Sequence, residues 1–336
     1  MGTAKGRAMY PFRTLCVRLF LGVSVGCAAL PAQAAEGTTA AGPIGGTDIR
    51  SAMLPPPGVY GGVVGLYSSV NEVRDGSGNP VAGLDAVDLN AKVAGAFFLY
   101  VPDFKLFDGT VGLLGFFTGG QECGQLVSAI PSRCISGFGD PYVEADWSRS
   151  FGHLRPSRDP NAFPIMEGLT VDVGFGAVLP IGQYDANLQA MNGISVGNKT
   201  FDIAPSVAFT YTTPPLIAEG TEFSTKIYWN DYGTNPVTDY KPGSLVDVDF
   251  AISEHIGRFQ VGPAGVYLRE IADDRQDGVV VPPDGRRLEY LAVGGVANYD
   301  IPEIGAAIKA KAVTTVLAQN SGVSKVLVIG IAKKLY

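Results

Sequence analysis

The sequence predicts an all-β protein, a transmembrane antiparallel β-barrel of about twelve strands with both termini on the periplasmic side. Segments of ten or more residues alternate between apolar and polar side chains, which is the period of a strand with different surroundings on its two faces. The 336 residues include 44 Gly and 23 Pro, which disfavour a helical bundle. The N-terminus has the pattern of an export signal.

Residues 1–34 have the layout of a secretory signal peptide. Four basic and no acidic side chains come first, an apolar run covers 19–30, and Ala-Gln-Ala occupies 32–34. The apolar run is shorter than the ~20 residues that a membrane anchor needs. Cleavage would remove Lys5, Arg7, Arg13 and Arg18 and leave 21 basic and 32 acidic side chains, a net charge of −11. This acidic balance argues against nucleic acid as a partner, because phosphate binding needs clustered Lys and Arg.

Residues 35–57 show no strand pattern and end in three consecutive prolines. Two interpretations remain open for this segment. It is a linker before the barrel, either disordered or lying along the wall, or it folds inward as a plug. The barrel itself is predicted to cover residues 58–336.

The clearest strand is 165–179, where Leu169, Val171, Val173 and Phe175 alternate with polar or small residues. The segments 221–232 and 244–257 alternate as regularly. The same pattern predicts the remaining strands at 58–72, 88–102, 109–119, 138–150, 201–212, 259–271, 288–299, 305–319 and 323–336. Because strands of weak alternation are easily miscounted, the range is ten to fourteen strands.

The connections between these strands also alternate in length, which is an independent indication of a barrel. The connections 73–87, 120–137, 180–200, 233–243 and 272–287 are polar and mostly long, whereas four of the five between them are short and 152–164 is the exception. In an outer-membrane barrel the short turns are periplasmic and the long loops external. A soluble β-sandwich is the alternative, but the strand lengths and the final strand ending in Tyr336 favour the barrel.

Cys123 and Cys134 are the two thiols that remain after export, and an even pair in an exported chain predicts a disulfide. A metal pair would need nearby histidine, and His occurs only at 153 and 255, so we expect no metal site and no cofactor. Neither histidine shares a strand face with a serine at hydrogen-bonding distance. The sequence therefore predicts no enzyme.

The lumen face is where functional side chains are expected, because charge facing lipid is costly. Alternation assigns nine charged residues to it: Lys92, Glu144, Asp146, Asp172, Lys226, Asp247, Asp249, Lys309 and Lys311. They form either a polar pathway that selects permeants by charge and size or a salt-bridged network that fills the lumen. Phe98, Tyr100 and Tyr228 are candidates for contact with an apolar permeant, or else anchors at the membrane interface.

Five motifs occur in this order along the chain: MLPPPGVY at 53–60, GFGDP at 137–141, LPIGQYD at 179–185, YKPG at 240–243 and VGPAGVY at 261–267. Together they resemble the putative MetA-pathway of phenol degradation family of exported Gram-negative β-barrel proteins. The likeness runs from about residue 50 to the C-terminus, and Ile181 departs from the threonine more usual there. The family supplies no catalytic motif.

The resemblance implies an outer-membrane barrel for passive uptake or binding of small hydrophobic or aromatic compounds. The alternatives are a general small-solute porin and a structural outer-membrane barrel. The expected partners are outer-membrane lipid and lipopolysaccharide, the solute, and the barrel assembly machinery, which would recognise the C-terminal strand.

Overall fold

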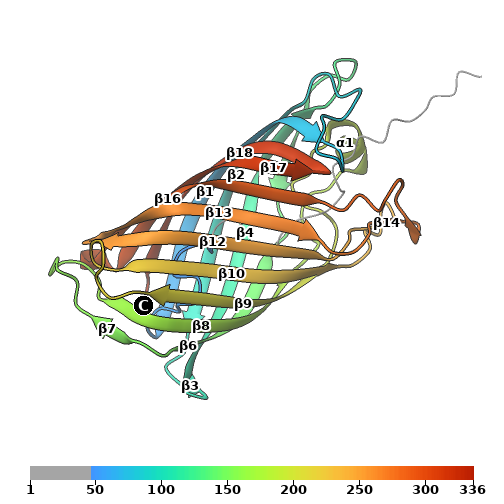
Figure 1. Ribbon diagram of the computed structural model, residues 1–336. Helices are drawn as coiled ribbons and strands as arrows, with labels where there is room; N and C mark the ends of the chain where they lie inside the picture. Colours follow the sequence, from blue (N-terminus) through green and yellow to red (C-terminus); the bar gives the residue numbers. More distant parts are fainter. Residues whose placement is uncertain (1–46) are drawn as a thin grey trace, which may run out of the picture. The chain divides into compact units, whose positions relative to one another are not determined.

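A computed structural model describes residues 47–336, so the predicted signal peptide and residues 35–46 lie outside the described residues. Twelve long strands form the wall (Figure 1). They are β1 (Gly58–Arg74), β2 (Asp88–Val101), β4 (Gly109–Gln125), β6 (Tyr142–Ser150), β8 (Ile165–Val178), β9 (Asp202–Thr212), β10 (Thr221–Tyr232), β12 (Leu245–Ile256), β13 (Phe259–Glu270), β16 (Glu289–Ile301), β17 (Ala306–Gln319) and β18 (Ser321–Lys334).

The twelve strands form a closed antiparallel barrel. Each pairs with its neighbours along the chain, and β1 also pairs with β18 from Tyr60↔Lys334 to Arg74↔Ser321. The pairing of β2 with β4 completes the ring. Closure leaves no unpaired sheet edge. The predicted fold class and strand number are confirmed.

The period-2 pattern separates the two faces of the wall. On β8, Thr170 and Asp172 are buried inside, whereas Val173 and Phe175 are more than half exposed on the outside. Large apolar side chains cover the outer face of other strands in the same way, for example Val63, Phe117, Trp229 and Ile329. Within residues 47–336, no helix is both long and apolar enough to cross a membrane.

The barrel has two dissimilar ends. One, which we call the terminal end, holds Gly58, the C-terminus, β3 (Lys105–Leu106), β7 (His153–Arg155) and the 3-10 helix η1 (Pro302–Ile304) (Figure 1). The other, the loop end, carries α1 (Ala186–Asn192) and a small sheet of β11 (Tyr240–Lys241), β14 (Arg275–Gln276) and β15 (Val279–Val280). That the terminal end is periplasmic stays a prediction.

Beyond the barrel wall at the loop end, β4 continues as a hairpin with β5 (Arg133–Phe138), where the sequence predicted a loop from 120 to 137. Cys123 and Cys134 are paired in register and joined by a disulfide. Pro141 separates β5 from β6, because proline has no N–H to donate to a neighbouring strand. The preceding Asp140 carboxylate instead accepts hydrogen bonds from the Gly182 and Asn198 N–H groups.

The unusually long connection after β6 folds back on the terminal end. β7 pairs with the start of β8, and the carboxylate of Glu219 accepts hydrogen bonds from the Ser157 hydroxyl and from the Arg158 and Gly257 N–H groups. Burial acts to raise the pKa of Glu219, but these hydrogen bonds outweigh it and lower that pKa. Three turns of the terminal end are thereby tied together at one carboxylate.

Glycines on the inner face of β8 make room for large side chains of β6. A Cβ built on Gly176 would lie 2.6 Å from Cζ of Tyr142, whose ring covers that glycine. On the outer face of β1, a Cβ on Gly65 would come no closer than 3.9 Å to another residue. The space beside Gly176 is therefore filled by Tyr142, whereas the space beside Gly65 is open.

We predict that Gly176→Ala lowers the free energy of unfolding by about 1–3 kcal/mol, because the Tyr142 ring has to shift in a packed interior. Gly65→Ala is the matched control and should leave stability unchanged or slightly higher. Urea unfolding in lipid vesicles, followed by tryptophan fluorescence, measures both. Equal midpoints for the two variants would show that Tyr142 does not pack on β8.

Candidate functional site in the barrel lumen

The first charged group in the lumen surrounds the ammonium of Lys226 on β10. Its Nζ lies 2.9 Å from Oε1 of Glu144, 3.0 Å from Oδ1 of Asp146 and 3.8 Å from Oδ1 of Asp172. The acids come from β6 and β8, so the contacts run across the interior rather than between paired residues. The Lys226 Nζ also lies 5.1 Å from the ring centroid of Tyr228. Four predicted lumen residues thus form one buried cluster of three acids and one base.

The second charged group joins β12 and β17. Lys309 and Lys311 both contact the Asp48 carboxylate, and the Lys311 Nζ lies 2.8 Å from Asp48 Oδ2. On β12, Asp249 Oδ2 accepts hydrogen bonds from the Thr47 hydroxyl at 2.6 Å and the Thr47 N–H at 3.1 Å. Asp247 is also buried, at 1% exposure. Asp48 and Thr47 belong to neither strand.

These two residues begin a segment, Thr47–Leu54, that crosses the inside of the barrel. Hydrogen bonds and ion pairs of its backbone and side chains reach six of the twelve strands: β6, β9, β10, β12, β16 and β17. The Ser51 and Ser224 hydroxyl oxygens lie 2.7 Å apart, and the Ala52 N–H donates to Thr210 Oγ1 at 3.1 Å. The described residues 47–54 therefore lie against the inner face of the wall; whether residues 35–57 form a linker or a plug stays a prediction.

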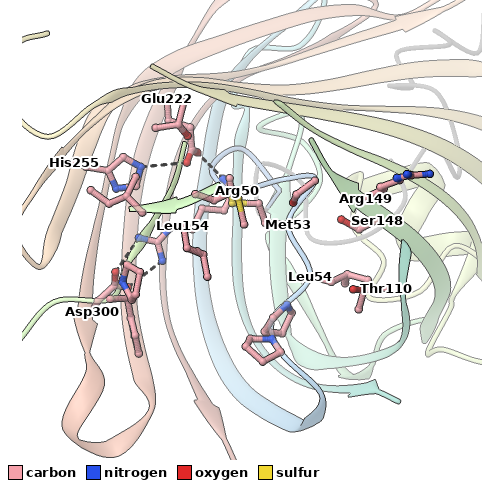
Figure 2. A pocket seen from close by; sticks show the side chains of 18 of the residues that line it. Arg50, Met53, Leu54, Thr110, Ser148, Arg149, Leu154, Glu222, His255 and Asp300 are labelled. Atoms are coloured by element: carbon pink, nitrogen blue, oxygen red, sulfur yellow. Dashed lines mark hydrogen bonds and ion pairs between the residues drawn. The ribbon is translucent and has the colours of Figure 1, made fainter. Parts of the chain in front are cut away.

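Arg50 is the third charged centre and lies toward the terminal end (Figure 2). Its guanidinium forms two hydrogen bonds with Asp300, at 2.8 and 3.1 Å, and its N–H donates to Glu222 Oε1 at 2.7 Å. His255 Nε2 lies 3.3 Å from the other Glu222 oxygen. These residues line a cavity of about 520 Å³, the mouth cavity, together with Met53 and other residues of the terminal end.

A second cavity, of about 310 Å³, is also lined by Arg50, and we call it the apolar cavity. Rings and aliphatic chains of the wall make up most of its lining: Val64, Phe97, Leu114, Phe116, Tyr142, Tyr228 and Val328. Ile49 of the crossing segment closes one side, and Glu144 and Lys309 supply the polar edge. Arg50 lines both cavities, so the crossing segment borders each of them.

The predicted positions of Lys92, Phe98 and Tyr100 need correction. The structure places all three on the outer face of β2, exposed, because Phe97 is the residue that packs inward against Phe116 and Tyr142. Both faces of β2 carry apolar or small residues, so its alternation does not distinguish inside from outside. Lys92 lies near the loop end of its strand, where a lysine reaches water from an apolar surface.

The other predicted lumen residues point inward. Glu144, Asp146, Asp172, Lys226, Asp247, Asp249 and Lys311 are buried, and Lys309 is half-buried. Tyr228 is also inside, with 1% exposure, and lines the apolar cavity.

The histidines are not arranged with a nucleophile. His255 lies on β12 and faces Glu222, while the neighbouring Ser253 hydroxyl accepts from Gln260. His153 is mostly exposed. In the described part of the chain, no group of three or more His, Cys, Asp or Glu side chains is placed to hold a metal ion.

Sequence reasoning missed Asp48, Arg50, Asp300 and the ring of Phe97. A signal for Asp48 existed: in register, Lys309 and Lys311 face Asn298, Val296, Gly330 and Val328 on the adjacent strands, none of them acidic. An acidic partner outside these paired positions could therefore be sought. The segment before the barrel was the nearest unassigned stretch of chain.

Residues 70–324 match the family described as "Putative MetA-pathway of phenol degradation". No curated protein sequence matches the chain. Among solved structures, the COG4313 outer membrane channel of Pseudomonas putida F1 is similar with a TM-score of 0.67 and 13% identity, covering 84% of this chain and 97% of that one. At this identity the likeness concerns the fold alone.

Two further barrels are similar at lower scores. A mutant of the TodX monoaromatic hydrocarbon channel has a TM-score of 0.38 and 8% identity, covering 84% of this chain and 91% of that one. A FadL homologue of Pseudomonas aeruginosa has a TM-score of 0.38 and 10% identity, covering 87% and 96%.

We predict that Lys226→Met lowers the free energy of unfolding by about 3–5 kcal/mol, because it leaves three buried carboxylates without their shared cation. Lys92→Met removes an exposed lysine from another wall strand and should change stability by less than about 0.5 kcal/mol. Urea unfolding of the refolded variants measures the difference. A Lys226→Met protein as stable as the control would mean that the three acids do not depend on Lys226.

Proposed function

Because the chain belongs to the putative MetA-pathway of phenol degradation family, we propose that it is an outer-membrane barrel for passive uptake or binding of small hydrophobic or aromatic compounds. The apolar cavity carries the proposal. A lumen built only for ions or sugars would not need a wall sector of Phe97, Phe116, Tyr142 and Tyr228.

The size of the apolar cavity suits a small aromatic solute. A cavity of about 150 Å³ lined by Leu, Ile and Phe in another protein binds benzene. The apolar cavity here is about 310 Å³ and therefore has room for one or two rings. Moving apolar surface from water into it is favourable by about 25 cal/mol per Å². Weak, non-directional contacts of this kind let a solute leave again.

The proposed mechanism is passive. Arg50 lines both the mouth cavity and the apolar cavity, and in this mechanism a solute passes between them when the Thr47–Leu54 segment shifts. The segment is held by hydrogen bonds and ion pairs that can re-form in place. No step uses an energy source, and no side chain is assigned a chemical reaction.

The outer face supports an outer-membrane location. Exposed Val63, Phe117, Trp229 and Ile329 come from strands around the ring, as expected of a wall in contact with lipid. We further propose that lipopolysaccharide surrounds one rim of the barrel and that the assembly machinery recognises β18. Export through a cleaved signal at residues 1–34 belongs to the same proposal.

We predict that Leu114→Trp abolishes uptake of radiolabelled toluene by intact Gram-negative cells, because the indole fills the apolar cavity. Leu114 lines that cavity, whereas its neighbour Leu113 is 50% exposed on the outer face, so Leu113→Trp is the matched control and should retain uptake. Heat-modifiable gel mobility verifies that both variants fold. The proposal fails if Leu114→Trp cells take up toluene like the wild type.

Uptake by the same cells also tests the alternative function, a general porin. An open pore would raise the uptake of a labelled pentose as much as that of toluene, and Leu114→Trp would reduce both in proportion. Under our proposal the pentose stays at the level of cells without the protein.

A further inference from the structure

The outer face of the wall is hollowed where β4, β2 and β1 lie side by side. In the two ladders, Ala94 of β2 is paired with Gly119 of β4 and with Gly65 of β1, so these three small residues form one row. Two adjoining hollows, of about 850 and 460 Å³, share this row and Ile329 of β18. We call the two hollows together the outer groove.

Larger side chains border the outer groove on both sides of this row. Phe117, Val63 and Ile331 stand on the side of the terminal end, and Tyr67 and Leu327 stand on the side of the loop end. All five side chains are exposed. On a wall that faces lipid, an acyl chain is the group that fills a groove with this apolar lining.

Two lysines lie on the loop-end side of the outer groove. Lys92 belongs to its lining, and Lys325 is two residues from Leu327 and therefore on the same face of β18. Both lysines are exposed. The residues paired with them carry no charge: Tyr67 and Gln121 for Lys92, and Ser69 and Thr314 for Lys325.

Neither of these two lysines has an acidic partner within residues 47–336. The lysines that form salt bridges there are Lys226, Lys309 and Lys311. The acid of β2 is Asp88, four residues from Lys92 or about 13 Å along the strand, and its carboxylate accepts a hydrogen bond from the Asn90 amide. Two ammonium groups therefore face outward beside an apolar groove and need an anion from outside the chain.

Phosphate is the anion that a lipid supplies at this level of the wall. A lysine at the edge of an apolar band extends its ammonium group toward the headgroups, and basic clusters there bind phosphorylated lipids. Lys92 and Lys325 stand on strands separated by β1, so a lipid with two phosphates suits them better than one with a single phosphate. Lipid A, the membrane anchor of lipopolysaccharide, has two phosphates and several acyl chains, and it belongs to the leaflet on the side predicted to be external.

We infer that the outer groove is a binding site for lipid A: one acyl chain lies over Gly119, Ala94 and Gly65, and the ammonium groups of Lys92 and Lys325 bind the phosphates. This inference rests on the outer-membrane location in the proposed function and gives the lipid contact proposed there a defined site. It does not depend on which solute enters the lumen.

Native mass spectrometry of the full mature protein in detergent measures binding of lipid A and of phosphatidylglycerol, which has one phosphate. The wild type should bind lipid A about tenfold more tightly than phosphatidylglycerol. Lys92→Met combined with Lys325→Met should weaken lipid A binding about tenfold. Lys105→Met combined with Lys333→Met is the matched control, because it removes two exposed lysines at the terminal end, and it should bind lipid A like the wild type.

A second pair of variants tests the groove itself. A Cβ on Gly65 would come no closer than 3.9 Å to another residue, so Gly65→Ile should fill the outer groove and weaken lipid A binding about fivefold or more. Gly295 is an exposed glycine of β16, where a Cβ would come no closer than 3.7 Å to another residue, and it does not line the outer groove. Gly295→Ile should therefore leave lipid A binding unchanged.

The inference is overturned if lipid A binds the variant without Lys92 and Lys325, or the Gly65→Ile variant, as tightly as the wild type. Equal affinity of the wild type for phosphatidylglycerol would assign the groove to ordinary phospholipid, and a dimer that excludes lipid A would assign it to a second copy of the chain; each result contradicts the inference. Failure of the proposed location has its own readout, absence of the protein from the outer-membrane fraction of cells, and the inference would fall with it.

Discussion

Charges that point into a closed barrel have to be neutralised from inside it, and this constraint organises the structure. The wall supplies Lys226 with three acids of its own, from β6 and β8. The positions paired with Lys309 and Lys311 are uncharged, and Asp247 and Asp249 of β12 interact electrostatically with Lys311. Asp48, from the segment before the first strand, contacts both lysines. The same segment brings Arg50 to Asp300. Electrostatic pairing therefore explains why this stretch crosses the lumen at all.

The position of Thr47–Leu54 determines which part of the lumen remains open. Its polar contacts are with β6, β9, β10, β12, β16 and β17, the sector where the wall carries acids, serines and threonines. The sector around β1, β2, β4 and β18 is apolar and aromatic and lines the apolar cavity together with Ile49. One side of the lumen thus binds the chain's own segment, and the other is available to a solute. The division is consistent with a passage for small apolar molecules rather than a wide aqueous pore.

Much of the fold could be predicted because a strand between lipid and a polar lumen alternates strictly, as on β8, β10 and β12. Where both faces of a strand are apolar, the period-2 pattern does not show which face points into the lumen. For this reason the pattern on β2 predicts a lumen position for Lys92, Phe98 and Tyr100, although they lie on the outer face. The β4–β5 hairpin was missed because it stands beyond the barrel, where polar residues line both faces. Lumen acids were identifiable residue by residue, but their partners were not. The contacts of Lys226 run between strands that are not adjacent, and a period-2 pattern contains no information on such contacts. The contacts of Thr47–Leu54 depend on closure of the ring and join residues far apart in the sequence, so the period-2 pattern could not show them.

A disulfide engineered between Thr47–Leu54 and the barrel wall would show directly that this segment lies inside the barrel. The Ser51 and Ser224 hydroxyl oxygens are 2.7 Å apart, so Ser51→Cys with Ser224→Cys should form a cross-link under mild oxidation in native outer membranes. Peptide mass spectrometry distinguishes it from the Cys123–Cys134 bond. We expect near-complete cross-linking of this pair. We expect none between Ser51→Cys and Ser136→Cys, because Ser136 lies on the β4–β5 hairpin at the loop end. A folded protein in which the first pair stays reduced would contradict the account.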